Sequence, residues 1–194
     1  MASELDRLVR RIRACRICEA TLDPHPVLHV SSSARILIAS QAPGLRVHKN
    51  GRSFDDTSGD RLRDWLSLDR ETFYDDTRIA LAGMAFCFPG YDQNGADRPP
   101  PHICAATWRK PLLALLPQIR LTLLVGSYAQ RWHLGDAAKS NMTETVRAWH
   151  DYAPGYIPLP HPSWRNNGWL KKNPWFERDL LPYLRRRVRR LLSS

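Results

Sequence analysis

Residues 36–54 read ILIASQAPGLRVHKNGRSF, which is an apolar run followed by a proline, two glycines and several cationic side chains. A near-continuous apolar run is typical of a strand that is buried on both faces of a parallel sheet. Pro43 and Gly44 suit a tight turn in which the backbone approaches a ligand closely. The stretch therefore predicts a buried strand that leads into a binding loop.

Four segments of this apolar kind occur along the chain, at residues 34–40, 78–87, 121–127 and 156–163. Helical periodicity occurs between them, in residues 59–68, 106–116 and 127–134. Alternating strands and helices predict an α/β fold, a three-layer αβα sandwich around a mainly parallel sheet of about four strands. Ligands bind such sheets at the carboxyl ends of the strands, where the segments SQAPG, FCFPG, VGS and PHPS lie.

Two amphipathic helices are expected at the ends of the chain. Residues 3–15 begin with a capping pair, Ser3 and Asp6, and have apolar residues at helical spacing. Residues 173–194 begin with a proline turn and continue as a helix with a dense arginine face. Its inward positions are Leu180, Leu181, Leu184, Val188 and Leu191. With 194 residues and 43% hydrophobic content, the chain is expected to form a single domain over residues 1–194.

The charge of the chain favours a polyanionic partner. Its 29 Lys and Arg residues exceed its 19 Asp and Glu residues, giving a formal net charge of +10. Such a balance attracts nucleic acid, but acidic membranes and solvated faces use the same residues. No secretory signal or membrane-spanning run of about 20 apolar residues is evident. We therefore expect a cytoplasmic protein that does not enter a membrane.

Four cysteines are candidate metal ligands: Cys15, Cys18, Cys87 and Cys104. The first two form a Cys-x-x-Cys, whose short spacing points both sulfurs the same way. Zinc sites usually contain two such pairs, and this chain has one. A [4Fe–4S] cluster tolerates the more open spacing. A redox Cys-x-x-Cys with two buried core cysteines remains the alternative.

Together these features resemble the iron–sulfur members of the uracil-DNA glycosylase superfamily, called families four and five. The shared features are the order of the four cysteines, the segments SQAPG and NGRSF after the first strand, and HPS at residues 161–163. The resemblance extends from about residue 10 to about residue 190. It implies a DNA glycosylase with a [4Fe–4S] cluster on the four cysteines.

The resemblance also assigns roles to residues of the binding loops. Phe54 would stack on a flipped base, beside the close backbone of Ala42 and Gly44, and His161 would donate a hydrogen bond to the base carbonyl. Ser163 would contact the substrate. The adjoining segment would bind DNA through its aromatic and basic side chains. Those side chains are Trp164, Arg165, Lys171 and Lys172.

Two departures from the family pattern bear on catalysis. Gln41 stands where family four has a glutamate, and an amide can orient water but cannot act as a base. Gly83 stands where family four places a uracil-reading asparagine, which favours broader recognition of deaminated or oxidised bases. The carboxylates nearest to Phe54 are Asp55 and Asp56, of which Asp56 is the expected water-positioning residue and His48 the reserve candidate. The pair also suits an ordinary turn and helix cap.

The sequence thus predicts a glycosylase that flips a deaminated base of single- or double-stranded DNA and hydrolyses its N-glycosidic bond in base excision repair. The base would be uracil, with hypoxanthine and xanthine as further candidates. Two alternatives stay open. One is a non-hydrolytic DNA-damage-binding protein on the same scaffold, and the other is a zinc or redox protein that uses its Cys-x-x-Cys.

Overall fold

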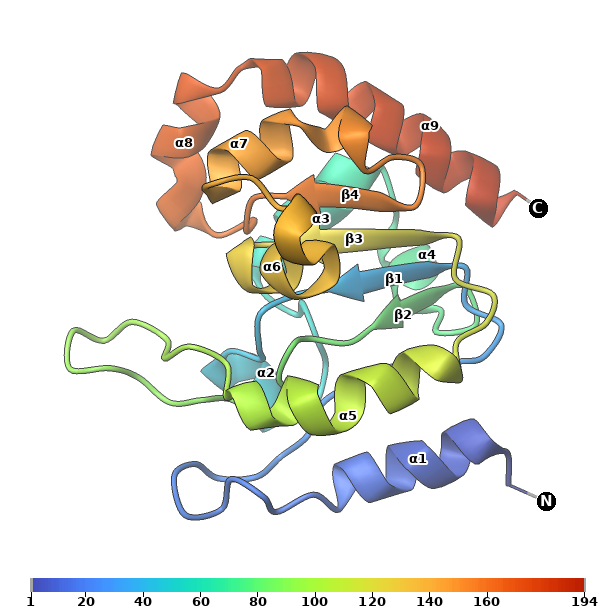
Figure 1. Cartoon of the computed structure of the whole chain (residues 1–194), viewed down its shortest axis with the longest axis vertical. Coiled ribbons are helices and arrows are strands. Elements are labelled where there is room, and N and C mark those ends of the chain that lie inside the picture. The colour runs from blue at the N-terminus through green and yellow to red at the C-terminus, as the bar shows by residue number, and fades with distance from the viewer. Residues whose placement is uncertain (1, 194) are drawn as a thin grey trace.

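The computed structural model describes residues 2–193. Its four strands form one sheet in the order β2-β1-β3-β4, and every neighbouring pair is parallel (Figure 1). The strands are β1 (Ile36–Ala39), β2 (Ile79–Leu81), β3 (Leu121–Val125) and β4 (Tyr156–Leu159). The predicted α/β class, with a parallel sheet of about four strands, is confirmed.

Helices connect the strands and cover both faces of the sheet. They are α1 (Glu4–Arg13), α2 (Leu45–Asn50), α3 (Thr57–Leu66), α4 (Arg70–Tyr74), α5 (His102–Ala114), α6 (Ser127–Leu134), α7 (Met142–Arg147), α8 (Asn167–Lys172) and α9 (Leu181–Leu192). Short 3-10 turns occur at Gly135–Ala137, Trp149–Asp151 and Trp164–Asn166, and a π turn spans Phe176–Leu180. Because all four strands are parallel, their carboxyl ends lie on the same side of the sheet (Figure 1).

Alternate residues of each strand pack against different helical layers. Ile36 and Ile38 of β1 belong to a cluster with α3, α4, α7 and α9, whereas Leu37 belongs to a cluster with α1 and α5. This alternation follows from the twofold side-chain period of a strand. The three layers predicted from the sequence are therefore present.

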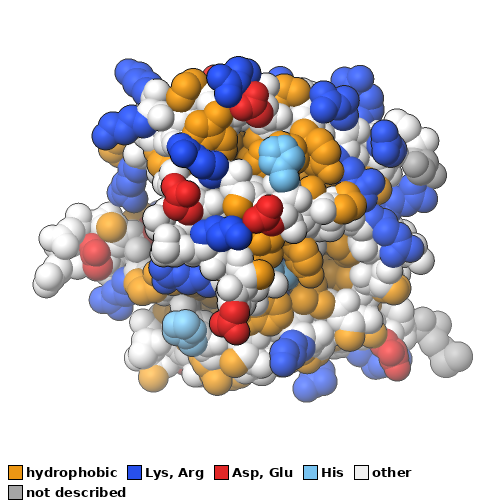
Figure 2. Space-filling view, turned by 45° about the horizontal axis from the view of Figure 1, so that its top comes forward, with side chains coloured by type: hydrophobic (Ala, Val, Ile, Leu, Met, Phe, Trp, Pro, Cys, Tyr) orange, Lys and Arg blue, Asp and Glu red, His pale blue; other side chains and the backbone are white. Residues whose placement is uncertain are grey.

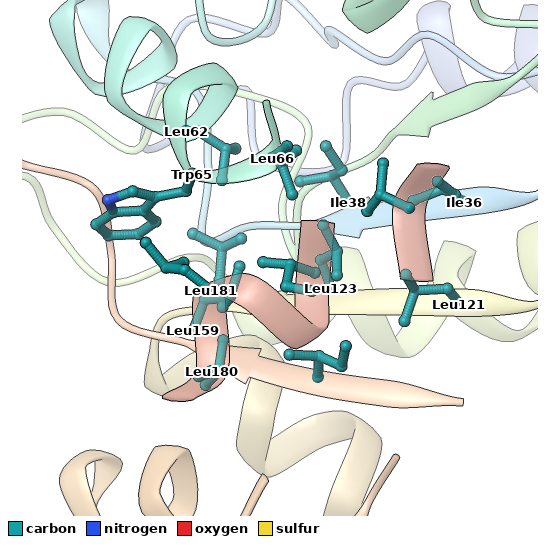
Figure 3. Close-up of a cluster of buried hydrophobic side chains, with 14 of the residues drawn as sticks. Ile36, Ile38, Leu62, Trp65, Leu66, Leu121, Leu123, Leu159, Leu180 and Leu181 are labelled. Atoms are coloured by element: carbon teal, nitrogen blue, oxygen red, sulfur yellow. The ribbon is translucent and has the colours of Figure 1, made fainter. Parts of the chain in front are cut away.

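The larger cluster lies between the sheet and the helices α3 and α9 (Figure 3). Leu62 and Leu66 of α3 lie on the side of the strand residues Ile38 and Leu123, whereas the Trp65 ring points away from them (Figure 3). The Trp65 ring meets the edge of Phe176 at 4.9 Å between centroids. Burying a Leu or Ile side chain contributes about 1.5–3 kcal/mol to folding, so this layer of buried side chains contributes strongly to the stability of the sandwich.

Both terminal helices form as the sequence predicts. Ser3 and Asp6 make a complete capping box at the start of α1. All five positions expected to face inward at the C-terminal end are buried. The C-terminal helical segment begins with the π turn at Phe176–Leu180, and α9 itself starts at Leu181. The described residues contain no helix that is both long and apolar enough to span a bilayer.

Two local predictions need correction. The second strand was expected over residues 78–87, but β2 ends at Leu81 and Cys87 lies in the bent segment beyond it. The chain bends over residues 84–87, and at Gly83 just before this bend an ideal Cβ would lie 2.7 Å from the Ala85 carbonyl oxygen. The loop expected after Gly44 is instead the short helix α2, which ends at Gly51 in the left-handed conformation that favours glycine.

Candidate active site

A cavity of about 140 Å³ opens at the carboxyl ends of the strands. Its walls come from the loops that follow β1, β2 and β4, together with the turn before α3. Seven predicted site residues line it: Ala42, Gly44, Phe54, Asp56, Gly83, His161 and Ser163. Residues that lie up to 121 positions apart in the chain thus meet because parallel strands place their loops at one edge.

His161 follows β4 and has a defined hydrogen-bonding pattern. Its Nδ1 accepts a hydrogen bond from the Ser163 backbone N–H at 3.2 Å, so the proton of the neutral ring belongs on Nε2. Within residues 2–193, Nε2 has no hydrogen-bond partner. Burial lowers the pKa of His161, with Asp56 and Asp97 opposing the shift. A neutral imidazole with a free N–H donor is the result.

Phe54 has an unusual backbone that the surrounding side chains hold in place. Its φ is +58°, a left-handed conformation that non-glycine residues rarely adopt. Its carbonyl accepts hydrogen bonds from the Tyr74 hydroxyl at 2.9 Å and from Arg63 Nη1 at 3.3 Å. The Phe54 ring meets Phe73 edge-on at 6.0 Å between centroids. These contacts fix an aromatic ring at the cavity wall.

The two adjacent aspartates have different surroundings. Asp55 forms an ion pair with Arg70 and accepts a hydrogen bond from Asn50 Nδ2 at 2.9 Å. The hydrogen bond from Arg70 lowers the pKa of Asp55. Asp56 caps α3 by accepting from the Gly59 N–H at 2.9 Å, and it lines the cavity. Of the pair, Asp56 is therefore the carboxylate that can meet a substrate.

A second carboxylate in the cavity wall, Asp97, was missed by the sequence analysis. It lies in a loop closed by an isolated bridge between Tyr91 and Asp97. Its carboxylate forms no hydrogen bond or ion pair with any other part of the described chain. The only sequence signal was an acidic residue in a Gly- and Pro-rich loop after a strand, and such loops commonly carry exposed aspartates without a function.

A buried Arg109–His133 pair supports the loop that contains Gly83. Arg109 Nη1 donates to the carbonyls of Ala82 at 2.8 Å and Gly83 at 3.1 Å, and Nη2 lies 3.0 Å from His133 Nε2. Burial lowers the pKa of Arg109 to about 10. Burial, together with the charge of Arg109, lowers the pKa of His133 to about 3. A neutral imidazole thus accepts from a charged guanidinium below the cavity floor.

Other predicted residues lie outside the cavity wall. Gln41 contributes its backbone carbonyl, which accepts from the Ala85 N–H at 3.0 Å. His48 lies in α2, where its Nε2 is 3.1 Å from Asp23 and its ring packs near His25 and Phe88. The reserve role of His48 in positioning water therefore has no geometric support. The Gln41 side chain does not line the cavity either.

The predicted DNA-contacting residues lie on the surface after His161. Trp164 is 69% exposed, and the Arg165 guanidinium lies 5.8 Å from its ring centroid. Lys171 and Lys172 are exposed at the end of α8. Ser163 lies between this surface and the cavity, whose wall it lines. Its hydroxyl accepts a hydrogen bond from the Arg165 N–H at 3.3 Å, and its carbonyl accepts one from Arg61 at 3.1 Å.

The four cysteines line one small apolar cavity between α1, α5 and the segment after β2. Its other walls include Ile12, Phe86 and Trp108. Burial raises the pKa of Cys87 to about 11 and that of Cys104 to about 12. The fold therefore brings together the two distant cysteines and the Cys-x-x-Cys, as the sequence analysis expected.

The chemistry of this cysteine cavity fits a four-thiolate centre. It offers four soft sulfur donors, and no histidine or carboxylate lines it beside them. Within residues 2–193, however, no group of three or more His, Cys, Asp or Glu side chains is arranged so that it could hold a metal ion. The four cysteines thus suit a four-thiolate centre by residue type and by their shared cavity, but their sulfur atoms are not arranged as metal ligands.

Comparison with known protein families shows a match for this chain. The sequence model described as "Uracil DNA glycosylase superfamily" matches residues 28–185, which is more than half of the chain. The matched region contains the whole sheet and every residue of the cavity wall except Val27. It includes Cys87 and Cys104 but begins after Cys15 and Cys18.

Proposed function

The chain belongs to the Uracil DNA glycosylase superfamily, and on that premise we propose that it excises a deaminated base from DNA. Membership indicates DNA glycosylase activity; the base and the repair pathway belong to the proposal. The observation that carries it is the shared cavity, which combines a neutral histidine, a rigid aromatic ring and two carboxylates. Such a set matches the needs of base excision: a stacking platform, a donor for the leaving base and a means to position water.

The first step is extrusion of the target nucleotide from the stack. The Phe54 ring stacks on the base, and the backbone at Ala42 and Gly44 lets the nucleotide approach closely. Because Tyr74 and Arg63 hold the Phe54 carbonyl, the platform is formed before DNA arrives. Such preorganisation lowers the cost of binding the flipped nucleotide.

His161 stabilises the leaving base. When the N-glycosidic bond breaks, both electrons stay with the base, which leaves as an anion with charge on its carbonyl oxygen. The Nε2–H of neutral His161 donates a hydrogen bond to that oxygen. The hydrogen bond from Ser163 to Nδ1 fixes the tautomer needed for this donation. An oxyanion donor of this kind is worth about 10²–10³ in rate.

Asp56 positions the water that completes hydrolysis. The water oxygen adds to C1′ of the sugar and passes a proton to the Asp56 carboxylate, which before this transfer also stabilises the electron-poor sugar by its negative charge. The Gly59 N–H holds one oxygen of Asp56, which leaves the other free for water. Asp97 is the second candidate for this role, because its carboxylate has no partner in the described part of the chain.

The floor of the cavity favours a broad choice of base. Gly83 presents backbone and no side-chain amide, and an ideal Cβ there would lie 2.7 Å from the Ala85 carbonyl oxygen. A larger residue at this position would therefore disturb the turn. With no amide side chain at this point to select uracil, we propose that hypoxanthine and xanthine are substrates as well as uracil.

The remaining elements of the proposal concern DNA and the cysteine cavity. Trp164, Arg165 and the two lysines of α8 bind the DNA backbone beside the flipped base, on single or double strands. The four cysteines hold a [4Fe–4S] cluster that ties α1 to the segment after β2. A bound cluster would supply structural cross-linking, since base hydrolysis transfers no electrons.

A single-turnover assay tests this function. Oligonucleotides that carry uracil, hypoxanthine or xanthine are incubated with excess protein, and alkali then reveals abasic sites. We expect His161→Ala to lose about 10²-fold or more in rate. Asp56→Asn should lose about 10²-fold because asparagine preserves the cap of α3 but removes the charge. Asp97→Asn is its matched control, with an expected loss below about tenfold.

Three outcomes would contradict the proposal in different ways. If Asp97→Asn loses more than Asp56→Asn, the roles of the two carboxylates are exchanged. Full activity of His161→Ala would remove the proposed leaving-group step. If the wild-type protein binds these oligonucleotides and cleaves none, it is a non-hydrolytic DNA-damage-binding protein on the glycosylase scaffold.

A further inference from the structure

Helix α9 has a concentration of positive charge that the active site does not use. It carries arginines at positions 185, 186, 187, 189 and 190 and no acidic residue. Three more arginines directly precede the strands of the sheet: Arg35 before β1, Arg78 before β2 and Arg120 before β3. Figure 2 shows Lys and Arg side chains gathered along the margin where α9 ends.

Backbone carbonyls, rather than carboxylates, hold several of these arginines. Arg35 donates to the Leu191 carbonyl at 3.3 Å, and Arg78 donates to the Leu192 carbonyl. Arg185 donates to the carbonyls of Trp65 at 3.2 Å and Asp64 at 3.0 Å. These contacts fix the guanidinium groups without neutralising them. None of the seven arginines at positions 35, 78, 120, 185, 186, 187 and 189 forms an ion pair with a carboxylate in the described residues.

Part of this cluster surrounds a cavity of about 180 Å³, which we call the basal pocket. It lies between α9 and the turn that joins α3 to α4. Three arginines line it, Arg78, Arg185 and Arg189, and no acidic residue is in its wall. Its hydroxyl residues are Ser67, Thr72 and Ser193. The Arg189 guanidinium is exposed and has no partner among residues 2–193. Three like charges around one concavity repel each other unless an anion lies between them.

The cavity that contains His161, here called the catalytic cavity, lies at the carboxyl ends of the strands. The basal pocket lies at their amino ends. Arg78 precedes β2 and lines the basal pocket, whereas Gly83 follows β2 and lines the catalytic cavity. Each strand advances about 3.3 Å per residue, so the sheet separates the two sites by more than about 10 Å. Phosphates seated beside the flipped base are therefore not the ones that reach the basal pocket.

We propose that the basal pocket binds backbone phosphates of a second nucleic-acid segment, so that one protein molecule contacts two DNA segments at once. Guanidinium groups bind phosphate through paired N–H donors, and hydroxyls add neutral donors. This inference rests on the proposed function only in that the first segment occupies the catalytic cavity. A protein that contacts two segments can transfer between them without first dissociating into solvent.

A bridging assay with undamaged DNA tests the inference. Biotinylated duplex is immobilised, full-length protein is added, and capture of a second, fluorescent duplex is measured against salt concentration. We expect the wild-type protein to capture it and Arg189→Glu to lose about tenfold or more in capture, with a salt slope smaller by about 1. Arg186→Glu is the matched control, since Arg186 is exposed on the same helix but does not line the pocket. It should stay within about twofold of wild type.

Several results would overturn the inference: no capture by the wild-type protein, equal capture by the two variants, or capture that persists in Arg189→Glu because the protein itself dimerises. Binding of phosphatidylserine vesicles without capture of a second duplex would assign the pocket to a membrane surface instead. If Arg189→Glu does not fold, Arg189→Gln removes the charge without reversing it. A protein that cleaves no damaged base but bridges DNA through Arg189 would refute the proposed function and support this inference.

Discussion

At the scale of single residues, the active site depends on one close backbone contact. Gly59 in the first turn of α3 lies so near to Phe54 that an ideal Cβ would be 1.7 Å from the Phe54 carbonyl oxygen. The same carbonyl is held by Tyr74 and Arg63. The missing side chain at Gly59 therefore allows the strained backbone of Phe54, and with it the position of the aromatic platform.

We predict that Gly59→Ala displaces Phe54 and lowers both stability and base excision. The added methyl group must move the Phe54 carbonyl, which overpacks the turn at a cost of about 1–3 kcal/mol. Thermal unfolding and single-turnover cleavage measure the two effects. Gly168→Ala is the control, because Gly168 lies in α8 with nothing within 4 Å of an ideal Cβ. An equal effect of the two substitutions would show that the contact with Phe54 is unimportant.

At the scale of elements, the Arg109–His133 pair joins helices on the same side of the sheet. Arg109 comes from α5 and His133 from α6, and the pair holds the segment after β2 through two carbonyls. His133 stays neutral in the folded protein, because its pKa is lowered to about 3. In the unfolded chain the same imidazole binds a proton below its ordinary pKa of about 6.5.

This difference predicts a loss of stability in acid. Between pH 6.5 and about 3, the unfolded state binds a proton at His133 that the folded state does not, so stability falls as pH falls through this window. His133→Gln keeps an acceptor for Arg109 and has no such proton to bind. Its melting temperature should therefore fall less than that of the wild-type protein between about pH 7 and about pH 4.

The exposed His150, which lies outside the pair, provides the control for this measurement. His150→Gln should show the pH dependence of the wild-type protein. Some acid sensitivity should survive in His133→Gln, because burial also lowers the pKa of His29. Parallel melting curves for the wild-type protein and His133→Gln would mean that His133 titrates in the folded state near its ordinary value.

At the scale of the whole molecule, the cysteine cavity joins the N-terminal helix to the body of the sandwich. We predict that the purified protein absorbs near 400 nm, as expected of iron–sulfur clusters, and that Ser substitution at each of the four cysteines lowers both its iron content and its melting temperature. All four substitutions should act alike if one centre is shared. A colourless zinc protein, or an effect confined to Cys15 and Cys18, would favour the zinc or redox alternatives. Loss of iron with unchanged fold and DNA affinity would refute the structural role.

Much of the architecture could be predicted from the sequence because apolar patterning is a local property. The parallel sheet, the three layers and the inward residues of α9 all follow from runs such as ILIA and from helical spacing. The boundaries were less predictable. β2 ends six residues before Cys87 and the chain bends over residues 84–87, and an apolar run alone does not distinguish a strand from a buried bend.

Local sequence patterns are enough to identify the superfamily, the parallel α/β sandwich and the segments that lie at the carboxyl ends of the strands. The iron–sulfur subtype and the single domain stay predictions. Which side chains meet there follows from the three-dimensional fold: Asp97 lines the cavity, His48 lies beside Asp23, and Arg109 binds the Ala82 carbonyl. The fold also gathers Arg78, which precedes β2, and Arg185 and Arg189 of α9 around one pocket. The physical reason is that patterning fixes which face of an element is buried, whereas loop paths and helix packing fix which distant residues become neighbours.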